Sequence, residues 1–276
     1  MTRRLFDAFA APVLAALLAV AGPATTSAQA RDDRGSSFTR MVDPDAEALL
    51  TAATPRARDS RVLVQSVLAN LSEAFSKVYQ VPRVALEGRW CRQPNAAYTA
   101  LPRPRVVVCY ELAQAIDRAF RGADSTTSDT SAARTLQFVV MHEVGHALAD
   151  VLKLPTTGST EDDADRFAMW HLLDVDEPAG ERKLERTFET IAAVSASLRD
   201  ASGKNIPADL VNQRLSNFAC WYHGYVALTG VEGAPADLPG VTLGARAPGC
   251  RREFEALRSE WRGRLSDYVR HPAPTG

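Results

Sequence analysis

Two histidines and a glutamate in one predicted helix are the residues of this sequence best suited to chemistry. His142 and His146 stand four positions apart within an apolar run. Residues four apart lie on the same face of an α-helix, so both imidazoles can reach one metal ion. Glu143 directly follows the first histidine, which places its carboxylate beside the metal at a distance suited to a bound water. The spacing therefore predicts two zinc ligands and a general base within about one helical turn.

A catalytic zinc ion generally has three protein ligands and one open position, so a third ligand should come from a neighbouring element. Glu161 and Asp165 lie four positions apart in an acidic segment, and Ser159 or Thr160 can cap a helix there. Glu161 is predicted to bind zinc, while Asp165 accepts the ring N–H of a ligand histidine. The alternative is that these acidic residues only complement the dipole at the start of a helix.

Two helices should carry these groups. Ala132 to Leu152 has the length and the apolar pattern of a helix, and the polar stretch Asp124 to Ser131 before it is predicted to be a loop. Pro155 and Gly158 end this helix. A short turn through them can fold a second helix, Asp162 to Leu173, back against the first.

The remaining pattern predicts a single α+β domain that is mostly helical. Val62 to Tyr79 has apolar residues at helical spacing, and Pro82 closes the run. Three short segments are expected to form a small antiparallel sheet: Arg83 to Trp90, Ala96 to Leu101 and Arg105 to Tyr110. Further helices are expected over Leu112 to Phe120, Glu181 to Leu198, Ala208 to Leu228 and Gly249 to Val269.

Residues 1–30 have the order of a secretory signal peptide. Arg3 and Arg4 precede an apolar run, and a stretch of small residues ends at Ala30, after which cleavage is expected. A buried N-terminal helix or an uncleaved anchor is the alternative. Residues 31–59 are polar and aperiodic and are predicted to be a flexible arm, so that the domain comprises residues 60–276. The mature protein should be periplasmic or secreted, without a stable membrane span.

Composition excludes one class of partner. The chain has 32 Lys and Arg residues against 33 Asp and Glu residues, so no global field favours binding to nucleic acid. With 46% hydrophobic residues in a chain of 276, a substantial core can be buried. The sequence does not indicate an oligomeric state.

Four cysteines, Cys91, Cys109, Cys220 and Cys250, allow three pairings. Export to an oxidising compartment favours two disulfides over thiol chemistry. We favour Cys91–Cys109, which would link the first and last predicted strands, together with Cys220–Cys250. Buried free thiols are the alternative.

The segment His142 to His146, followed by Glu161 and Asp165, resembles the gluzincin metallopeptidases, in which a glutamate on a second helix completes the zinc site. Most of the chain after Val62 is similar to a bacterial family of metallopeptidases of unknown function. That similarity rests on Asn95 to Tyr98, Cys109 to Leu112, Gln213 to Cys220 and Cys250 to Phe254. The resemblance implies a zincin-like fold and a zinc cofactor, and it brings no established substrate.

The sequence departs from that family where a histidine is expected before the helix that contains Gln213, since none lies between Ala201 and Asn212. If that histidine stabilised a transition state, another residue must do so here. Tyr222 and His223 are the nearest residues that could donate a hydrogen bond to a developing oxyanion. They also fit an ordinary packed aromatic helix.

Together these features predict an exported zinc-dependent peptidase with a peptide or protein substrate. Zinc would polarise the scissile carbonyl and acidify its water, while Glu143 takes the water proton and delivers it to the leaving amine. Asn95 and Tyr98, if they lie on an edge strand over the cleft, could help to bind an extended peptide. Two alternatives stay open: a zinc-stabilised envelope protein that binds a partner without turnover, and a zinc amidase that acts on cell-wall fragments.

Overall fold

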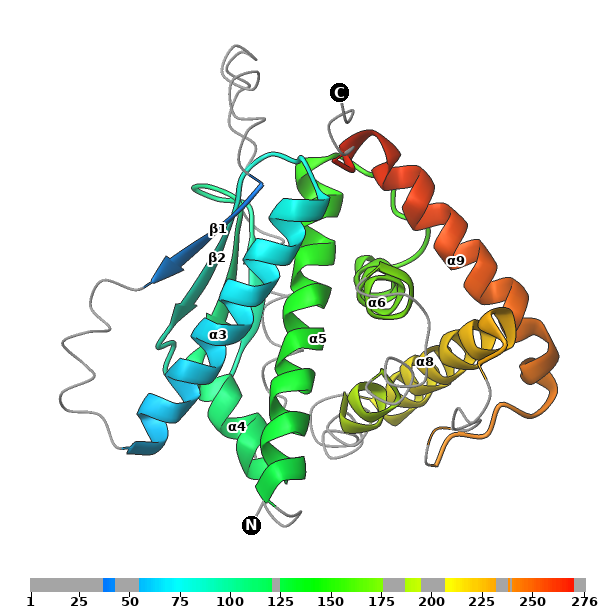
Figure 1. Cartoon of the computed structure of the whole chain (residues 1–276), viewed down its shortest axis with the longest axis horizontal. Helices are drawn as coiled ribbons and strands as arrows, with labels where there is room; N and C mark the ends of the chain where they lie inside the picture. The colour runs from blue at the N-terminus through cyan, green and yellow to red at the C-terminus, as the bar shows by residue number, and fades with distance from the viewer. Residues whose placement is uncertain are drawn as a thin grey trace.

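The computed structural model describes residues 37–42, 55–120, 125–175, 187–194, 207–231, 238 and 240–270. A small sheet lies on one side of the molecule, with helices packed on one of its faces (Figure 1). The strands are β1 (Phe38–Val42), β2 (Val84–Arg89), β3 (Ala96–Thr99) and β4 (Arg105–Cys109). The long helices are α3 (Pro55–Val78), α4 (Tyr110–Phe120), α5 (Ser125–Val151), α6 (Thr160–Trp170), α8 (Ala208–Thr229) and α9 (Cys250–Leu265), and residues 187–194 are also helical. Short helical turns are η1 (His171–Val175), η2 (Gly244–Gly249) and η3 (Ser266–Tyr268). The predicted α+β class is confirmed.

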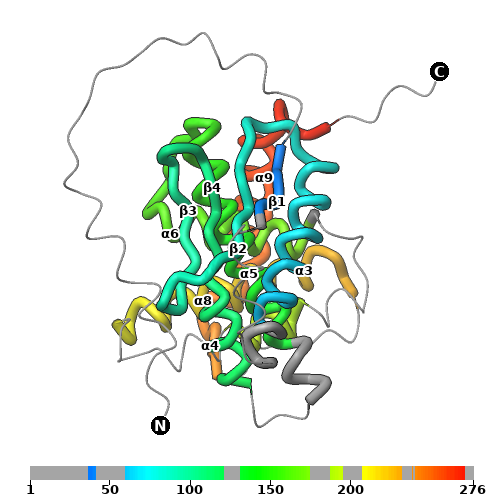
Figure 2. The backbone as a smooth tube through the Cα atoms, turned by 90° about the vertical axis from the view of Figure 1, so that its left-hand side faces the viewer, coloured from blue at the N-terminus to red at the C-terminus, as the bar shows by residue number. Residues whose placement is uncertain are grey.

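The sheet is mixed, so the prediction of an antiparallel sheet was wrong. Its strand order is β1-β2-β4-β3. Strand β2 pairs in parallel with both β1 and β4, and only β3 runs antiparallel to its neighbour β4. After β2 the chain forms β3, which is not a neighbour of β2. Strand β4, which follows β3 in the sequence, lies between β2 and β3 (Figure 2). An antiparallel sheet of consecutive strands would place β3 between β2 and β4, whereas the observed order leaves β3 at an edge of the described sheet.

Strand β1 lies within the segment that was predicted to be a flexible arm. Phe38 is buried, and its ring centroid lies 5.2 Å from that of Phe75 on α3. The Phe38 carbonyl accepts hydrogen bonds from Ser72 Oγ at 3.1 Å and from Ser76 Oγ at 3.2 Å. These contacts attach β1 to the domain, so ordered structure begins before residue 60. The predicted signal peptide, residues 1–30, lies outside the described residues.

Helices α3 and α5 cover the same face of the sheet, with α3 over β1 and β2 and α5 over β3 and β4 (Figures 1 and 2). On α3, Val64, Leu68, Leu71 and Phe75 are buried at helical spacing. Burial of each such side chain stabilises the fold by roughly 1.5–3 kcal/mol. This packing sets the edge of β3 that is unpaired among the described strands beside α5.

Helix α5 begins at Ser125, so the prediction of a loop up to Ser131 was wrong. Within the helix, Thr135 Oγ1 donates a hydrogen bond to the Ser131 carbonyl at 2.8 Å. A hydroxyl that bonds to the carbonyl four residues earlier is satisfied inside a helix. Polar composition is therefore compatible with a helix here, and it did not distinguish the helix from a loop.

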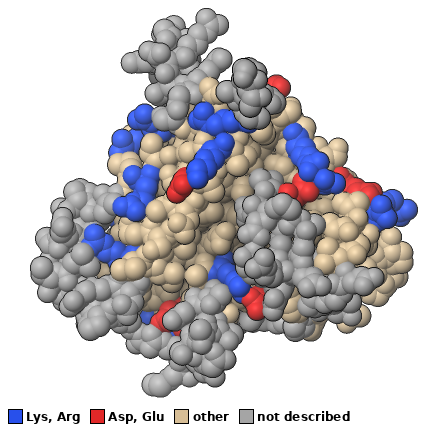
Figure 3. All heavy atoms as spheres, viewed as in Figure 1, with Lys and Arg blue, Asp and Glu red and all other residues tan. Residues whose placement is uncertain are grey.

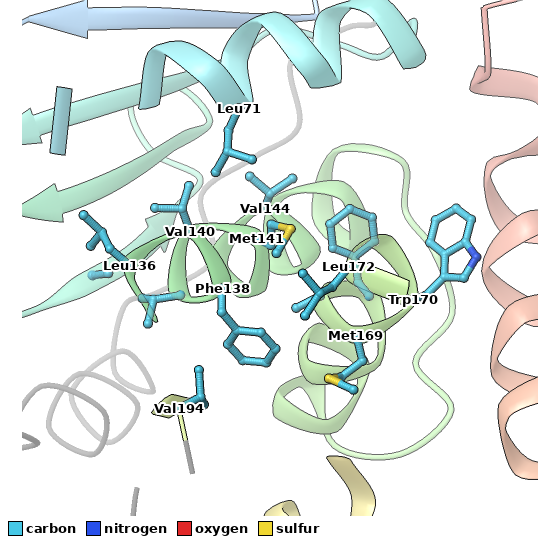
Figure 4. Packing of buried hydrophobic residues seen from close by; sticks show 14 of the residues in the cluster. Leu71, Leu136, Phe138, Val140, Met141, Val144, Met169, Trp170, Leu172 and Val194 are labelled. Carbon is cyan, nitrogen blue, oxygen red and sulfur yellow. The ribbon is translucent and has the colours of Figure 1, made fainter. Parts of the chain in front are cut away.

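Helix α6 crosses α5 steeply. Figure 1 shows α6 nearly end-on, while α5 runs along the page. Gly145 makes the crossing close: a Cβ atom at this position would stand 3.0 Å from the Cα of Ala164 on α6. Apolar side chains pack beside the crossing, including Met141 and Val144 of α5, with Leu71 of α3 above them (Figure 4). The first turn of α6 is thereby held against α5.

Both predicted disulfides are present. Cys91–Cys109 joins the loop after β2 to the end of β4, and Cys220–Cys250 joins α8 to the first residue of α9. Gly224 lets α8 and α9 approach, since a Cβ atom there would overlap the Cys250 carbonyl. Among the described helices, none combines the length and the apolar character that a bilayer span requires.

Candidate metal centre

Three side chains from α5 and α6 converge at one point. His142 Nε2 lies 3.3 Å from Glu161 Oε2, and His146 Nε2 lies 3.4 Å from Glu161 Oε1. The two imidazole Nε2 atoms are 3.2 Å apart. Ligand atoms at about 2.0–2.2 Å from a tetrahedral zinc ion lie roughly 3.3–3.6 Å from one another. The donor atoms therefore fit a zinc ion in both chemical type and spacing.

Two other groups of potential ligand side chains occur in the described part of the chain. One contains Cys91 and Cys109, and the other contains Cys220 and Cys250. All four sulfur atoms are in disulfides, so they are not available as thiolate ligands. Within the described residues, the histidine pair with Glu161 is thus the metal-binding candidate.

Local structure brings the glutamate to the histidines. Ser159 is the N-cap of α6, and its side chain accepts a hydrogen bond from the Asp162 amide at 3.0 Å. Glu161 therefore lies in the first turn of α6, at the end that meets α5. The absent side chain of Gly145 permits this approach. Capping and close packing together position the third donor.

A buried carboxylate and a buried guanidinium support the first histidine. Asp165 Oδ1 lies 2.8 Å from His142 Nδ1. Arg214 of α8 donates from Nε to Asp165 Oδ2 at 2.7 Å and from Nη2 to Oδ1 at 2.6 Å. Burial alone would raise the pKa of Asp165, but the charge of Arg214 and the contact with His142 outweigh it and lower the pKa. The ionised carboxylate favours a proton on His142 Nδ1, which leaves Nε2 to face the cleft.

The same contacts set the protonation of the metal-free site. Burial lowers the pKa of His142, but hydrogen bonds to Asp165 and Glu161 outweigh it and raise the pKa to about 10. Burial raises the pKa of Glu161, whereas its contacts with His142 and His146 hold that pKa well below its ordinary value. At neutral pH the metal-free protein therefore has a protonated His142, and metal binding must displace a proton.

Glu143 faces the same cleft and is held by the sheet. Its Oε2 accepts a hydrogen bond from the backbone N–H of Tyr98 on β3 at 2.8 Å. Burial raises the pKa of Glu143, and this effect exceeds the lowering by His142 and His146. A carboxyl group with a raised pKa is suited to take up a proton and return it.

A cavity of about 440 Å³ lies in front of these groups. One wall comes from β3 and includes Ala96, Ala97 and Tyr98, and the other comes from α5 and the first turn of α6. Tyr98 spans the two walls, because its hydroxyl donates to Asp150 Oδ2 on α5 at 2.6 Å. The site is therefore a cleft between the β3 edge of the described sheet and the two helices that carry the donors. We call it the catalytic cleft, for the role that we propose for it.

The structure does not bring Tyr222 and His223 to the catalytic cleft. Neither is among the described residues that line it. Tyr222 is fully buried on α8, its ring centroid lies 5.9 Å from that of Phe188, and burial raises its pKa to about 12. This is the ordinary packed helix that the sequence left open as the alternative.

Sequence reasoning missed the role of Arg214 and the contact between the Tyr98 amide and Glu143. Arg214 belongs to the buried face of α8, together with the apolar residues Val211 and Leu215. An arginine on an apolar helix face is a signal that could have indicated a buried ion pair. The Tyr98 amide leaves no such signal, because every residue except proline has the same N–H group.

The fold and the site together define a class: an α+β chain in which two crossing helices bring two histidines and a glutamate to a cleft beside a sheet edge. A family model described as "Putative metallopeptidase" matches residues 51–265, and the chain belongs to that family. The similarity to a family of metallopeptidases of unknown function is thereby confirmed, and membership implies a metal cofactor and peptide substrates. No curated protein and no solved structure matches the chain.

Proposed function

We propose that the protein is a zinc peptidase whose metal ion is held by His142, His146 and Glu161. The convergence of these three donors on the wall of a cleft that also contains Glu143 is the observation that carries the proposal. Structural zinc sites usually have four protein ligands, whereas catalytic sites have three and an open position. Three donors that border a cleft therefore favour catalysis over the non-catalytic binding protein.

A bound zinc ion would polarise a substrate carbonyl and lower the pKa of a water molecule. Glu143 would take a proton from that water and return it to the leaving amine. The Tyr98 amide aims its carboxylate at the cleft, so Glu143 can act without being a ligand. Asp165 and Arg214 would keep the His142 ring in its ligand orientation.

The edge of β3 suits a peptide substrate. The Cys109 amide donates to the Asn95 carbonyl at 2.9 Å across the β3–β4 pair. Hydrogen bonding alternates along an antiparallel ladder, so the backbone of Ala97 also faces β4, and that of Ala96 and Tyr98 faces the catalytic cleft. The Tyr98 amide is engaged by Glu143, so an extended peptide would pair with the other outward backbone groups of Ala96 and Tyr98 and lie across the metal ligands. This favours a peptidase over an amidase that acts on cell-wall fragments.

We also propose that the protein is exported, to the periplasm or the medium. The order of basic, apolar and small residues up to Ala30 supports it, as do two disulfides, which persist in oxidising compartments. N-terminal sequencing of the exported protein should begin at Arg31. An intact N-terminus on protein that stays in the cytoplasm would contradict this.

Zinc analysis combined with a peptide-library cleavage assay tests the function. The wild type is expected to carry zinc and to cleave peptides, and His146→Ala should lose both. His223→Ala is the matched control, because this histidine lies on α8 outside the catalytic cleft, and it should retain both. A zinc-loaded wild type that cleaves cell-wall fragments and no peptide would favour the amidase. Zinc without any turnover would favour the binding protein.

A further inference from the structure

The face of the sheet that points away from α3 and α5 carries arginines. Side chains alternate between the two faces of a strand, so Arg89 of β2 and Arg105 of β4 lie opposite the buried Leu86 and Val106. A cavity of about 570 Å³ lies over this face, and Arg89, Arg92 and Arg105 are among its lining residues. We call this cavity the arginine pocket.

The arginine pocket has an excess of positive charge. Its described lining residues include three arginines and no Asp or Glu. Glu87 lies beside it, but its carboxylate oxygens are 3.5 Å from Arg89 and 3.9 Å from Arg105, longer than a strong charge-assisted hydrogen bond. The Glu111 carboxylate accepts the backbone N–H of Arg92 at 2.6 Å and so is already engaged. On the face drawn in Figure 3, basic side chains lie over the side that holds the sheet and α3 and also over α9.

Two buried polar atoms of residues that line the pocket have no hydrogen-bond partner among the described residues. They are Arg105 Nε and Asn95 Oδ1. A buried N–H without an acceptor costs about 1–3 kcal/mol, more when the group is charged. A carboxylate can accept two parallel N–H bonds from one guanidinium. Nε itself is closed to solvent, but the Arg105 side chain lines the pocket and is 25% exposed, so a ligand carboxylate would bind the part of this side chain that faces the pocket.

The pocket adjoins the catalytic cleft across strand β3, because Ala97 lines both cavities. A peptide paired with the edge of β3 would send alternate side chains to the two faces of the sheet. The peptide residue opposite Ala97 would point to the arginine face, where the methyl group of Ala97 leaves room. Strand β4 would be two strand spacings, about 10 Å, from this peptide, which an arginine and a glutamate side chain can span together.

We propose that the arginine pocket selects peptide substrates with an acidic side chain close to the scissile bond. The inference rests on the proposed function and names its substrate class: peptides with Glu or Asp at the residue that pairs opposite Ala97. The next residue of β3, Tyr98, donates its amide to Glu143, so the selected residue lies near the reacting carbonyl.

Matched peptides test the proposal. Otherwise neutral peptides, each with one Glu at a varied position, are compared with the same peptides carrying Gln there. For the register that places Glu opposite Ala97, the wild type should cleave the Glu peptide about tenfold faster at low substrate concentration. Arg105→Gln and Arg89→Gln should move this ratio toward one. Glu87→Gln should raise the ratio, because it removes the carboxylate that competes for both arginines.

The control is Arg118→Gln, which makes the same charge change at an exposed position of α4 and should leave the ratio as in the wild type. Equal rates for Glu and Gln peptides at every position would overturn the proposal and leave the proposed function intact. If Arg105→Gln does not fold, Glu87→Gln decides, because its expected effect has the opposite sign and a merely structural role would not produce it.

If the wild type cleaves no peptide, the proposed function fails, and binding then tests the pocket. Fluorescently labelled Glu and Gln peptides are titrated with Glu143→Gln protein, and anisotropy reports binding. The proposal expects tighter binding of the Glu peptide, with the difference removed by adding Arg105→Gln. Equal affinity, or no binding of either peptide, overturns it.

Discussion

Glu143 and its neighbouring histidines occupy one turn of α5, yet their side chains have different partners. The imidazole Nε2 atoms of His142 and His146 meet Glu161, whereas the Glu143 carboxylate accepts the Tyr98 amide. Side chains on the same helix turn therefore contact different groups, the histidines contacting Glu161 and Glu143 contacting the Tyr98 amide. The metal binding and the proton transfer that we propose can therefore be tested separately by substitution.

Glu143→Gln should keep zinc and the melting temperature but lose catalysis. Glutamine has nearly the same volume and keeps a carbonyl that can accept the Tyr98 amide, while the proton acceptor is removed. A general base typically contributes about 10²–10⁴-fold, so cleavage should fall by that factor. Metal content, melting temperature and cleavage are measured on one preparation, with Glu161→Gln as the variant expected to lose zinc. Full activity of the zinc-loaded Glu143→Gln protein would end the mechanism.

Removal of the metal should make stability depend on pH through His142. In the metal-free protein its pKa is raised from 6.5 to about 10. A raised folded-state pKa contributes stability that is fully present below the unfolded pKa and is lost as pH rises through the folded value. The melting temperature of metal-free protein should therefore fall between pH 6.5 and about 10. His142→Gln should not show this decrease, and a flat profile for metal-free wild type would contradict the assignment.

At the scale of elements, the crossing of α5 and α6 decides whether the three donors meet. Helix α5 carries both histidines, and α6 carries Glu161 and Asp165. A small outward shift of α6 would move both carboxylates away from the imidazoles at once. The closeness of the two helices at Gly145 is thus a property of the site as well as of the core.

Gly145→Ala should weaken zinc binding and lower stability. The new Cβ would stand 3.0 Å from Ala164 Cα and 3.2 Å from Phe167 Cβ, so α6 must move outward. Overpacking of this kind typically costs about 1–3 kcal/mol. Chemical denaturation and zinc titration measure the two effects.

Gly263→Ala on α9 is the matched control, since a Cβ there meets no atom within 4 Å. Alanine at a helical position should raise stability by up to about 1 kcal/mol and leave zinc affinity unchanged. Equal behaviour of the two variants would show that the crossing is not tightly packed at Gly145.

At the scale of the whole molecule, two helices that follow later in the sequence, α8 and α9, contact α6 and so support the site. Helix α8 supplies Arg214 to Asp165, and α9 supplies Glu260, which pairs with Arg166 of α6. The disulfide Cys220–Cys250 ties α8 to α9, so the two outer helices support α6 together.

Replacement of Cys220 and Cys250 by Ala should therefore lower stability. The disulfide closes a loop between positions 30 residues apart, and loop entropy of this size corresponds to about 3.6 kcal/mol. The free energy of unfolding is compared between the oxidised wild type and the double variant. Under reducing conditions the wild type should approach the variant, and equal stability in oxidising buffer would contradict the prediction.

The sequence by itself determined the helices around the site and the local part of the site. His142, Glu143 and His146 lie within one helical turn, so their spacing and the 3.6-residue period predict their relative positions. Glu161 follows on the next helix, and the predicted disulfides join cysteines only 18 and 30 residues apart. Contacts between residues near in sequence leave few alternative geometries.

Only the tertiary structure decided the order of the sheet, the place of β1 and the supports of the site. Arg214 meets Asp165 across 49 residues, and Tyr98 meets Glu143 across 45. The alternation of a strand is the same whichever neighbour it pairs with, and helical periodicity shows which face of α8 is buried but not what it packs against. For this reason the sequence could suggest Tyr222 as a hydrogen-bond donor in a cleft that Tyr222 does not line. Pairing and packing partners depend on contacts distant in sequence, which no local pattern encodes.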